Sequence, residues 1–149
     1  MVKQSKYSGN DGVYNASISS VAMGTSLLGE WVQILLPYGL SLTSYQLSSK
    51  NSYYLGVNWH ILGSIDGTTW ALLDNRTNPF AYWTSMPSDT MVTFNAVSNI
   101  KYTTFRMIVS SSGPSTVAGV TGLNFGGFPP PPPIQVTPLT TKFNSNTIT

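Results

Sequence analysis

The sequence predicts an all-β domain, an antiparallel β-sandwich of the jelly-roll type. Short apolar segments with a period of two recur along the chain, and turn residues separate them roughly every ten residues. Between Met1 and Phe125 no segment has a sustained helical period. We expect seven or eight strands of this kind, which bury their apolar faces against one another in a sandwich or jelly roll.

The 149 residues divide into three parts. Residues 1–12 are polar and are expected to form an N-terminal arm, and residues 13–127 are expected to form the sandwich. Residues 128–149 begin with a proline run, which favours a stiff, extended polyproline II tail. A linker and an arm that docks on a neighbouring subunit both fit this composition. We expect the docking arm, with its contacts made by Phe128, Pro129, Pro130, Pro131, Pro132 and Pro133.

Composition excludes several classes of function. Charged residues make up only 8% of the chain, and the seven basic residues are scattered along it, so no basic surface for nucleic acid is expected. The absence of cysteine excludes disulfides and thiol chemistry. The longest apolar run, residues 32–36, is far too short to cross a bilayer, so no membrane insertion is expected.

Three strands are expected before the centre of the chain. Residues 13–21 can hold a short first strand. Residues 31–36 are almost continuously apolar, which is typical of a strand that is buried on both faces, and Pro37 should end it. A turn at Tyr38-Gly39 should lead into the next strand at residues 40–47.

The segment from Trp59 to Arg76 predicts a β-hairpin. Trp59, Ile61 and Gly63 alternate with polar and apolar neighbours, and Asp66-Gly67 is typical of a tight turn because both residues tolerate positive φ. The second strand should begin at Trp70. Trp59 and Trp70 are expected to be core residues.

Three more strands are expected after the hairpin. Residues 78–89 lack a usable period and are interpreted as a long connection. Strands should follow at residues 91–97, 102–109 and 117–125, and the last of these is interrupted by glycine. The inward faces should carry Val92, Phe94 and Ala96 in the first and Phe105, Met107 and Val109 in the second.

Four segments, in this order and spacing, resemble the discoidin or coagulation-factor C-type family: Gly29 to Ile34, Leu42 to Tyr45, Trp59 to Trp70 and Phe105-Arg106. The resemblance runs from about Tyr14 to Gly127 and implies a galactose-binding-like jelly roll. The segment GEWVQILLPYGLSLTSY is most similar to discoidin-type modules in structural proteins of large DNA viruses and marine phages.

The resemblance implies binding rather than catalysis, through loops at one end of the sandwich, with sugars or lipid head groups as frequent ligands. Many members also hold a structural calcium ion to which a glutamate in the last strand contributes, but Gly122 takes that place here. A calcium ion needs several oxygen ligands including carboxylates, and the chain has only five acidic residues. We therefore expect no metal ion and no other cofactor.

No catalytic residues are expected. The single histidine, His60, has no second histidine, cysteine or carboxylate near it in sequence, so a structural role is favoured. A glycosidase needs two placed carboxylates, and Glu30 belongs to one of the matched structural segments.

The candidate ligand-binding residues are loop aromatics with polar neighbours. Sugar rings pack their C–H faces on tyrosine and tryptophan, while their hydroxyl groups need fixed polar partners. The chain offers one such set: Asn51, Tyr53, Tyr54, Arg76, Asn78, Tyr82 and Trp83. Plugging the ends of the core is the competing role for these aromatics, whereas Trp31, Trp59 and Trp70 match structural positions of the family.

Two functions remain open. The first is a non-enzymatic virion structural protein, capsid or surface, whose arm and tail dock on other virion subunits or on copies of itself. The second is a carbohydrate-binding module or receptor-binding head that recognises a cell-surface glycan through its end loops. The first implies location in the virion, and the second implies an extracellular or cell-surface location.

Overall fold

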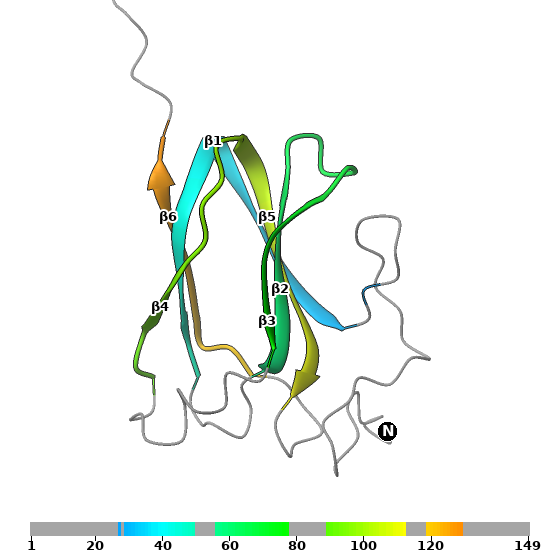
Figure 1. Ribbon diagram of the computed structural model, residues 1–149, viewed down its shortest axis with the longest axis vertical. Helices are drawn as coiled ribbons and strands as arrows, with labels where there is room; N and C mark the ends of the chain where they lie inside the picture. Colours follow the sequence, from blue (N-terminus) through cyan, green and yellow to red (C-terminus); the bar gives the residue numbers. More distant parts are fainter. Residues whose placement is uncertain (1–26, 28, 50–55, 78–88, 113–118, 130–149) are drawn as a thin grey trace, which may run out of the picture.

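The computed structural model describes residues 27, 29–49, 56–77, 89–112 and 119–129. These ranges form six β-strands and contain no helix, hence none that could cross a membrane. The strands are β1 (Glu30–Ser48), β2 (Gly56–Ser64), β3 (Ala71–Thr77), β4 (Val92–Asn95), β5 (Lys101–Ser112) and β6 (Gly122–Phe128) (Figure 1). Every pairing between them is antiparallel. The predicted all-β, antiparallel class is confirmed.

Strand β1 belongs to both layers of the molecule. The sheet has the order β3-β2-β5-β1-β4, and β6 also pairs with β1. The first half of β1 pairs with β5, whereas its second half lies between β4 and β6. Figure 1 shows that β1 turns over at one end of the molecule between these halves. A strand that changes layers at a bend is a known way to close a sandwich.

The predicted turn at Tyr38-Gly39 is wrong, because the chain continues as one strand. Leu35 pairs with Thr104 and Leu40 pairs with Tyr102. Between these two pairs β1 advances by five residues, whereas β5 advances by only two. The extra residues form a bulge that interrupts the hydrogen-bond ladder. Pro37, which has no backbone N–H to donate, lies within this bulge. Proline therefore marks the bend of β1 instead of its end.

The first half of β1 is not buried on both faces as predicted. Trp31 is 50% exposed and Leu35 is 73% exposed. Among the described strands this half pairs only with β5, so it forms an edge of its layer. An apolar run can therefore occupy an edge strand, where its neighbours cover one side alone.

The hairpin of β2 and β3 is confirmed, but its turn is longer than predicted. Gly63 pairs with Ala71, which leaves a loop around Asp66 and Gly67 instead of a two-residue turn. Gly67 has a φ of 75°, and Asp66 Oδ1 accepts hydrogen bonds from the backbone N–H groups of Thr69 and Thr68 at 2.6 and 2.8 Å. These two bonds hold the pKa of the Asp66 carboxyl well below its usual range.

For the last three strands, the inward-facing residues were predicted better than the residues at which the strands begin and end. Phe94 and Ala96 are buried, as are Phe105, Met107 and Val109 of β5. Strand β6 begins at Gly122, later than predicted, and includes Phe128, which pairs with Ser41. The strand expected at residues 13–21 lies outside the described residues, as does the connection 78–88.

The main core lies between the two layers. Trp59, Tyr45 and Phe105 are fully buried in it. The ring of Phe105 stacks on Phe125 of β6 with centroids 4.8 Å apart, although β5 and β6 do not pair. The predicted core role of Trp59 is therefore confirmed. Trp70 is also buried, but in a smaller cluster with Leu62 and Ile108 on the other face of the sheet.

Candidate functional site

One end of the sandwich gathers the chain positions that flank three long connections; we call it the loop end. Gly56 pairs with Ser112 there, and Ser49 accepts a hydrogen bond from the N–H of Asp89 at 3.0 Å. Ser49 Oγ also donates to the carbonyl of Gly119 at 2.9 Å. Segments 50–55, 78–88 and 113–118 thus all leave and rejoin the described chain at this end (Figure 1).

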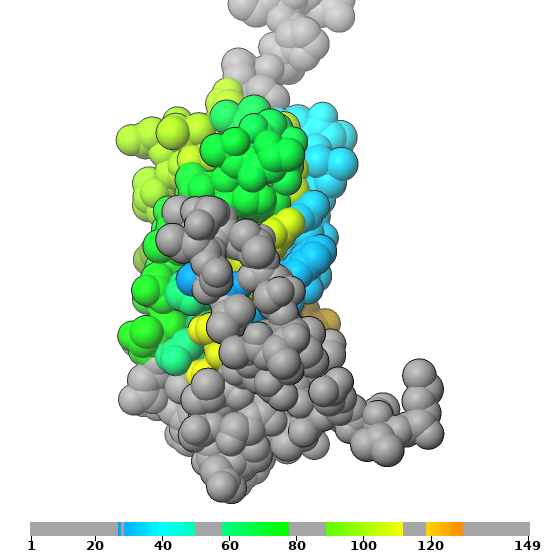
Figure 2. All heavy atoms as spheres, turned by 90° about the vertical axis from the view of Figure 1, so that its right-hand side faces the viewer, coloured from blue at the N-terminus to red at the C-terminus, as the bar shows by residue number. Residues whose placement is uncertain are grey.

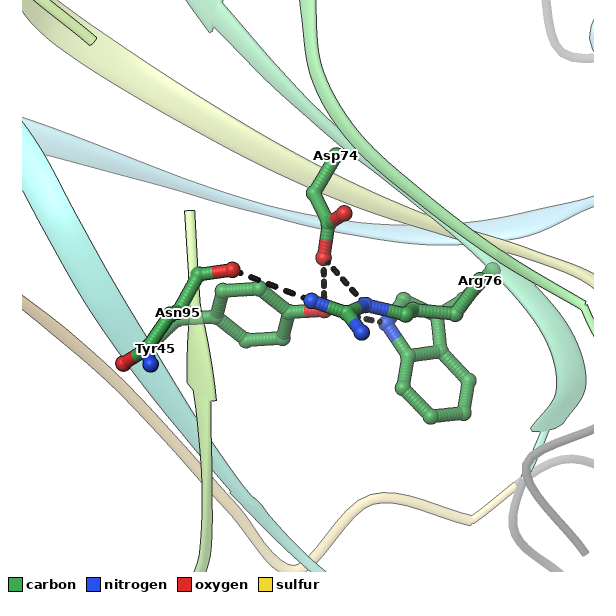
Figure 3. Close-up of polar contacts among 5 residues, drawn as sticks. Tyr45, Asp74, Arg76 and Asn95 are labelled. Atoms are coloured by element: carbon green, nitrogen blue, oxygen red, sulfur yellow. Dashed lines mark hydrogen bonds and ion pairs between the residues drawn. The ribbon is translucent and has the colours of Figure 1, made fainter. Parts of the chain in front are cut away.

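A hydrogen-bond chain runs from the core to the surface close to the loop end (Figure 3). The indole Nε1 of Trp59 donates to Tyr45 Oη at 2.8 Å, and Tyr45 Oη donates to Asp74 Oδ2 at 2.6 Å. Arg76 Nε donates to the same carboxylate oxygen at 2.7 Å. Because Asp74 and Arg76 are two residues apart on β3, they lie on the same face of that strand.

Electrostatics keeps the two titratable donors of this chain, Tyr45 and Arg76, protonated. Burial raises the pKa of the Tyr45 phenol, and the hydrogen bond to Asp74 raises it further. The hydrogen bond to Asp74 likewise raises the pKa of the Arg76 guanidinium. Arg76 is therefore a fixed cation with 37% of its side chain exposed, held by a carboxylate that is only 15% exposed.

Arg76 also joins the two edges of the sheet. Its Nη2 donates to the backbone carbonyl of Asn95 at 3.0 Å, which links edge strand β3 to edge strand β4 (Figure 3). Its Cζ lies 5.5 Å from the centre of the Phe94 ring, and that ring stacks on Tyr45 with centroids 5.2 Å apart. The guanidinium is thus oriented by an ion pair, a carbonyl and an aromatic face.

A small pocket opens where the two edges meet. It has a volume of about 260 Å³ and is lined by Arg76, Val92, Thr93, Phe94 and Asn95. Among the described residues, Arg76 Nη1 has no hydrogen-bond partner. The pocket therefore places a charged donor beside two polar residues, Thr93 and Asn95, and Thr93 Oγ1 accepts a hydrogen bond from Gln46 Nε2 at 3.1 Å. Such a lining suits a small polar ligand.

Of the predicted ligand-binding residues, the structure describes Arg76 alone. The other six, Asn51, Tyr53, Tyr54, Asn78, Tyr82 and Trp83, lie outside the described residues. They belong to segments 50–55 and 78–88, both of which adjoin the loop end. The predicted tail residues divide in the same way: Phe128 ends β6 and Pro129 follows it, whereas Pro130, Pro131, Pro132 and Pro133 are not described.

Sequence reasoning missed two polar residues of the pocket, Thr93 and Asn95, and the carboxylate that orients Arg76. Asp74 was not named as a partner of Arg76, although its spacing of two from Arg76 places both side chains on one strand face. That spacing was the available indication of an ion pair. Asn95 holds Arg76 through its backbone carbonyl, which no residue type reveals, and Thr93 joins the pocket only because the sheet curls.

The structure also places the residues considered for metal binding and catalysis. The described residues contain no cluster of three or more histidine, cysteine or acidic side chains that could hold a metal ion. A Cβ atom added at Gly122 would lie 2.6 Å from Ser48 Oγ, so local packing favours glycine at this position. His60 Nε2 lies 3.5 Å from Ser110 Oγ, and its Nδ1 is buried with no hydrogen-bond partner in the described part of the chain.

A second group of aromatic and polar side chains lies on the outer face of the sheet. The guanidinium of Arg106 is placed between two indoles, 4.5 Å from the ring centre of Trp31 and 4.0 Å from that of Trp70. Its Nη2 and Nε donate to Gln33 Oε1 at 2.7 and 3.1 Å. Burial lowers the pKa of Arg106, and the two rings hold its charge in a fixed plane.

Comparison with known proteins shows the fold. No protein-family model matches the chain, and no curated protein matches it in sequence. Among solved structures, it is similar to the carbohydrate-binding module CBM62 of Clostridium thermocellum Xyl5A, with a TM-score of 0.52 and 14% identity over 68% of this chain and 70% of that chain. It is also similar to the C-terminal domain of a chitobiase from Bacteroides fragilis, with a TM-score of 0.52 and 16% identity over 71% of this chain and 68% of that chain. The antiparallel β-sandwich jelly roll that was expected from the sequence is confirmed as the fold.

Proposed function

We propose that this protein is a non-catalytic carbohydrate-binding module that recognises a glycan at the loop end of its sandwich. The observation that carries the proposal is the pocket between β3 and β4, in which Arg76 is oriented before any ligand arrives. The similarity to CBM62 supports the choice of ligand class. An extracellular or cell-surface location follows from such a role.

The chemistry of the pocket suits a sugar. Sugar hydroxyls both donate and accept hydrogen bonds, and three of the residues that line the pocket, Arg76, Thr93 and Asn95, are polar. Asp74 fixes the guanidinium, so little side-chain entropy is lost when a ligand binds. A pocket of about 260 Å³ has room for one monosaccharide unit rather than a long oligosaccharide.

The loop aromatics complete the proposed site. Segment 78–88 begins immediately after Thr77, so Tyr82 and Trp83 are only a few residues along the chain from Arg76. Tyr53 and Tyr54 belong to another segment that adjoins the same end. We expect at least one of these rings to supply the apolar surface on which a sugar face packs. That role remains a prediction.

The virion structural role, which was the first expectation from the sequence, receives no support from the comparisons. The similarity to CBM62, a carbohydrate-binding module, fits the alternative better. We therefore propose the glycan, rather than a virion subunit, as the primary partner.

Glycan-array screening of the full chain, followed by calorimetric titration of each hit, tests this proposal. Arg76→Ala should weaken binding by roughly tenfold to a hundredfold, the effect of losing one charge-assisted hydrogen bond. Trp83→Ala should weaken it as well if the loop supplies the stacking surface. Lys101→Ala is the matched control, since Lys101 is an exposed cation on β5 that does not line the pocket.

The variants must first give the circular dichroism spectrum of the parent chain. A chain that binds no glycan would overturn the proposal. A hit that survives Arg76→Ala and Trp83→Ala unchanged would place the binding site elsewhere.

A further inference from the structure

The end of the sandwich opposite the loop end is where the tail begins; we call it the tail end. Ser41 pairs with Phe128 of β6 on one side and with Lys101 of β5 on the other. Figure 1 shows β6 running away from the loop end and toward the bend of β1. The proline run that starts at Pro129 thus leaves the sheet at the end of the sandwich where β5 begins, with β1 between them.

The tail end also carries an apolar groove. It has a volume of about 460 Å³ and is lined mainly by Ile65, Trp70, Ala71, Ile100 and Tyr102. Figure 2 shows the turn between β2 and β3, in green, bordering the yellow-green atoms that precede β5 at this end of the molecule. Ile65 and Ile100 are 64% and 54% exposed, so each leaves a large apolar side chain in contact with water.

The groove matches the chemistry of a proline-rich segment. Proline rings pack well against aromatic and aliphatic side chains, and a polyproline II helix loses little entropy on binding because it is already extended. Such a segment offers carbonyl groups and no N–H groups, so it needs donors from its partner. Trp70 and Tyr102 both line the groove, and they carry an indole N–H and a hydroxyl as donors.

We propose that this groove binds the proline run, residues 129–133, of a second copy of the chain. The occupant is a segment of this protein because the tail begins at the same end of the sandwich as the groove. The contact does not involve the loop end and therefore goes beyond the proposed glycan-binding function. Its chemical basis is the packing of prolines against Ile65, Ile100, Trp70 and Tyr102.

The distances favour a neighbour's tail over the chain's own tail. Phe128 and Lys101 flank Ser41, so they are two strand spacings apart, about 10 Å. Five prolines in polyproline II extend about 15 Å and do not reverse direction. The prolines of the same chain would therefore extend beyond the groove. Only residues that follow them could turn back and reach it.

The contact is heterologous, since it joins the tail of one copy to the groove of the next. Heterologous contacts form rings or open chains rather than closed pairs. Copies linked in this way would each present their own loop end. Several weak glycan contacts would then act together, which raises avidity without any new contact.

Two variants of the full chain separate the partners of this contact. In the first, Pro129, Pro130, Pro131, Pro132 and Pro133 are each changed to serine, which removes the tail ligand and leaves the groove. In the second, Ile100→Asp places a charge in the groove and leaves the tail. Val97→Asp is the control, because Val97 is an exposed apolar residue, 75% exposed, that does not line the groove.

Sedimentation velocity over a range of concentrations gives the readout. The parent chain and Val97→Asp should self-associate, whereas each of the two test variants alone should associate at least tenfold more weakly. An equimolar mixture of the two variants should restore a one-to-one complex, since one supplies the groove and the other the tail.

Three outcomes would overturn the proposal. The parent chain remains monomeric at every concentration, or a test variant associates like the parent, or the mixture fails to form a complex. A monomeric parent whose tryptophan fluorescence changes in the serine variant would instead assign the groove to the chain's own tail. Loss of glycan binding leaves this test unaffected, because the two sites lie at opposite ends.

Discussion

Tyr45 of β1 donates its phenolic hydrogen to Asp74 Oδ2 of β3 at 2.6 Å, although 29 residues separate them in sequence. The bond connects the strand at the centre of one layer to the edge strand of the other. Trp59 Nε1 donates to the same phenol oxygen, so Tyr45 Oη serves a buried donor and a carboxylate acceptor at once. The core and the candidate site therefore share one atom.

Tyr45→Phe should destabilise the protein by about 1–3 kcal/mol, since it leaves the buried indole N–H of Trp59 without its acceptor. The aromatic ring remains, so packing against Phe94 is retained. Urea denaturation followed by tryptophan fluorescence measures the change. Tyr38→Phe, at a tyrosine that is 46% exposed, is the control and should shift the midpoint little. Equal midpoints for the two variants would show that the bond to Trp59 adds no stability.

Gly63→Ala should destabilise the protein by about 1–3 kcal/mol through overpacking. A Cβ atom at this position would lie 2.7 Å from the ring of Tyr102 and 2.9 Å from Leu73 Cδ1. Both neighbours belong to strands that pack on β2 or pair with it, so neither can move freely. Thermal unfolding measures the effect. Gly67→Asn is the control, because a Cβ atom there meets nothing within 4 Å and asparagine tolerates positive φ. A Gly63→Ala variant as stable as the parent would contradict this packing.

Arg106→Lys should weaken the outer face of the sheet by about 0.5–1.5 kcal/mol. Lysine cannot stack its charge between the Trp31 and Trp70 rings or donate two fixed hydrogen bonds to Gln33. The effect should be small because Trp31 is half exposed. The tryptophan emission spectrum of the folded protein should shift as well. Lys101→Ala, at an exposed cation of the same strand, is the control for that spectral change.

The parts of the fold that sequence predicted are those set by local periodicity. The alternation of Trp59 and Ile61, and that of Phe105, Met107 and Val109, depends only on the period of two within a strand. The bend of β1 could not be predicted in this way, because Pro37 has the same local preference whether the strand ends or bulges. The exposure of Trp31 depends on which strands flank β1, and that is a property of the whole sheet.

The candidate site shows the same division. Arg76 could be named from its residue type and its place beside aromatic segments. Its orientation could not, since it depends on a backbone carbonyl of β4, 19 residues away. That carbonyl comes within reach only because β3 and β4, the two ends of the strand order, meet when the sheet curls. Such a contact leaves no pattern in the sequence.

The stability of the protein should fall as the pH drops below about 6.5, because burial lowers the pKa of His60 in the folded state. Above that pH the imidazole is neutral in both states and contributes no pH dependence. Below it the unfolded chain binds a proton before the folded chain does, so the free energy of unfolding decreases. The decrease ends once the pH is below the folded pKa. His60 is the single histidine, so no other imidazole contributes in this range.

Urea midpoints at pH 8, 7, 6 and 5 measure this effect, and His60→Gln should flatten the profile between pH 7 and 5. The contribution of Asp66 falls in a separate range, because its lowered pKa adds stability that is present above about pH 4 and lost as the pH falls further. Asp66→Asn should therefore leave the profile between pH 7 and 5 unchanged. A parent chain whose midpoint is constant from pH 8 to pH 5 would show that His60 takes up its proton equally well in both states, which its buried, unpartnered Nδ1 argues against.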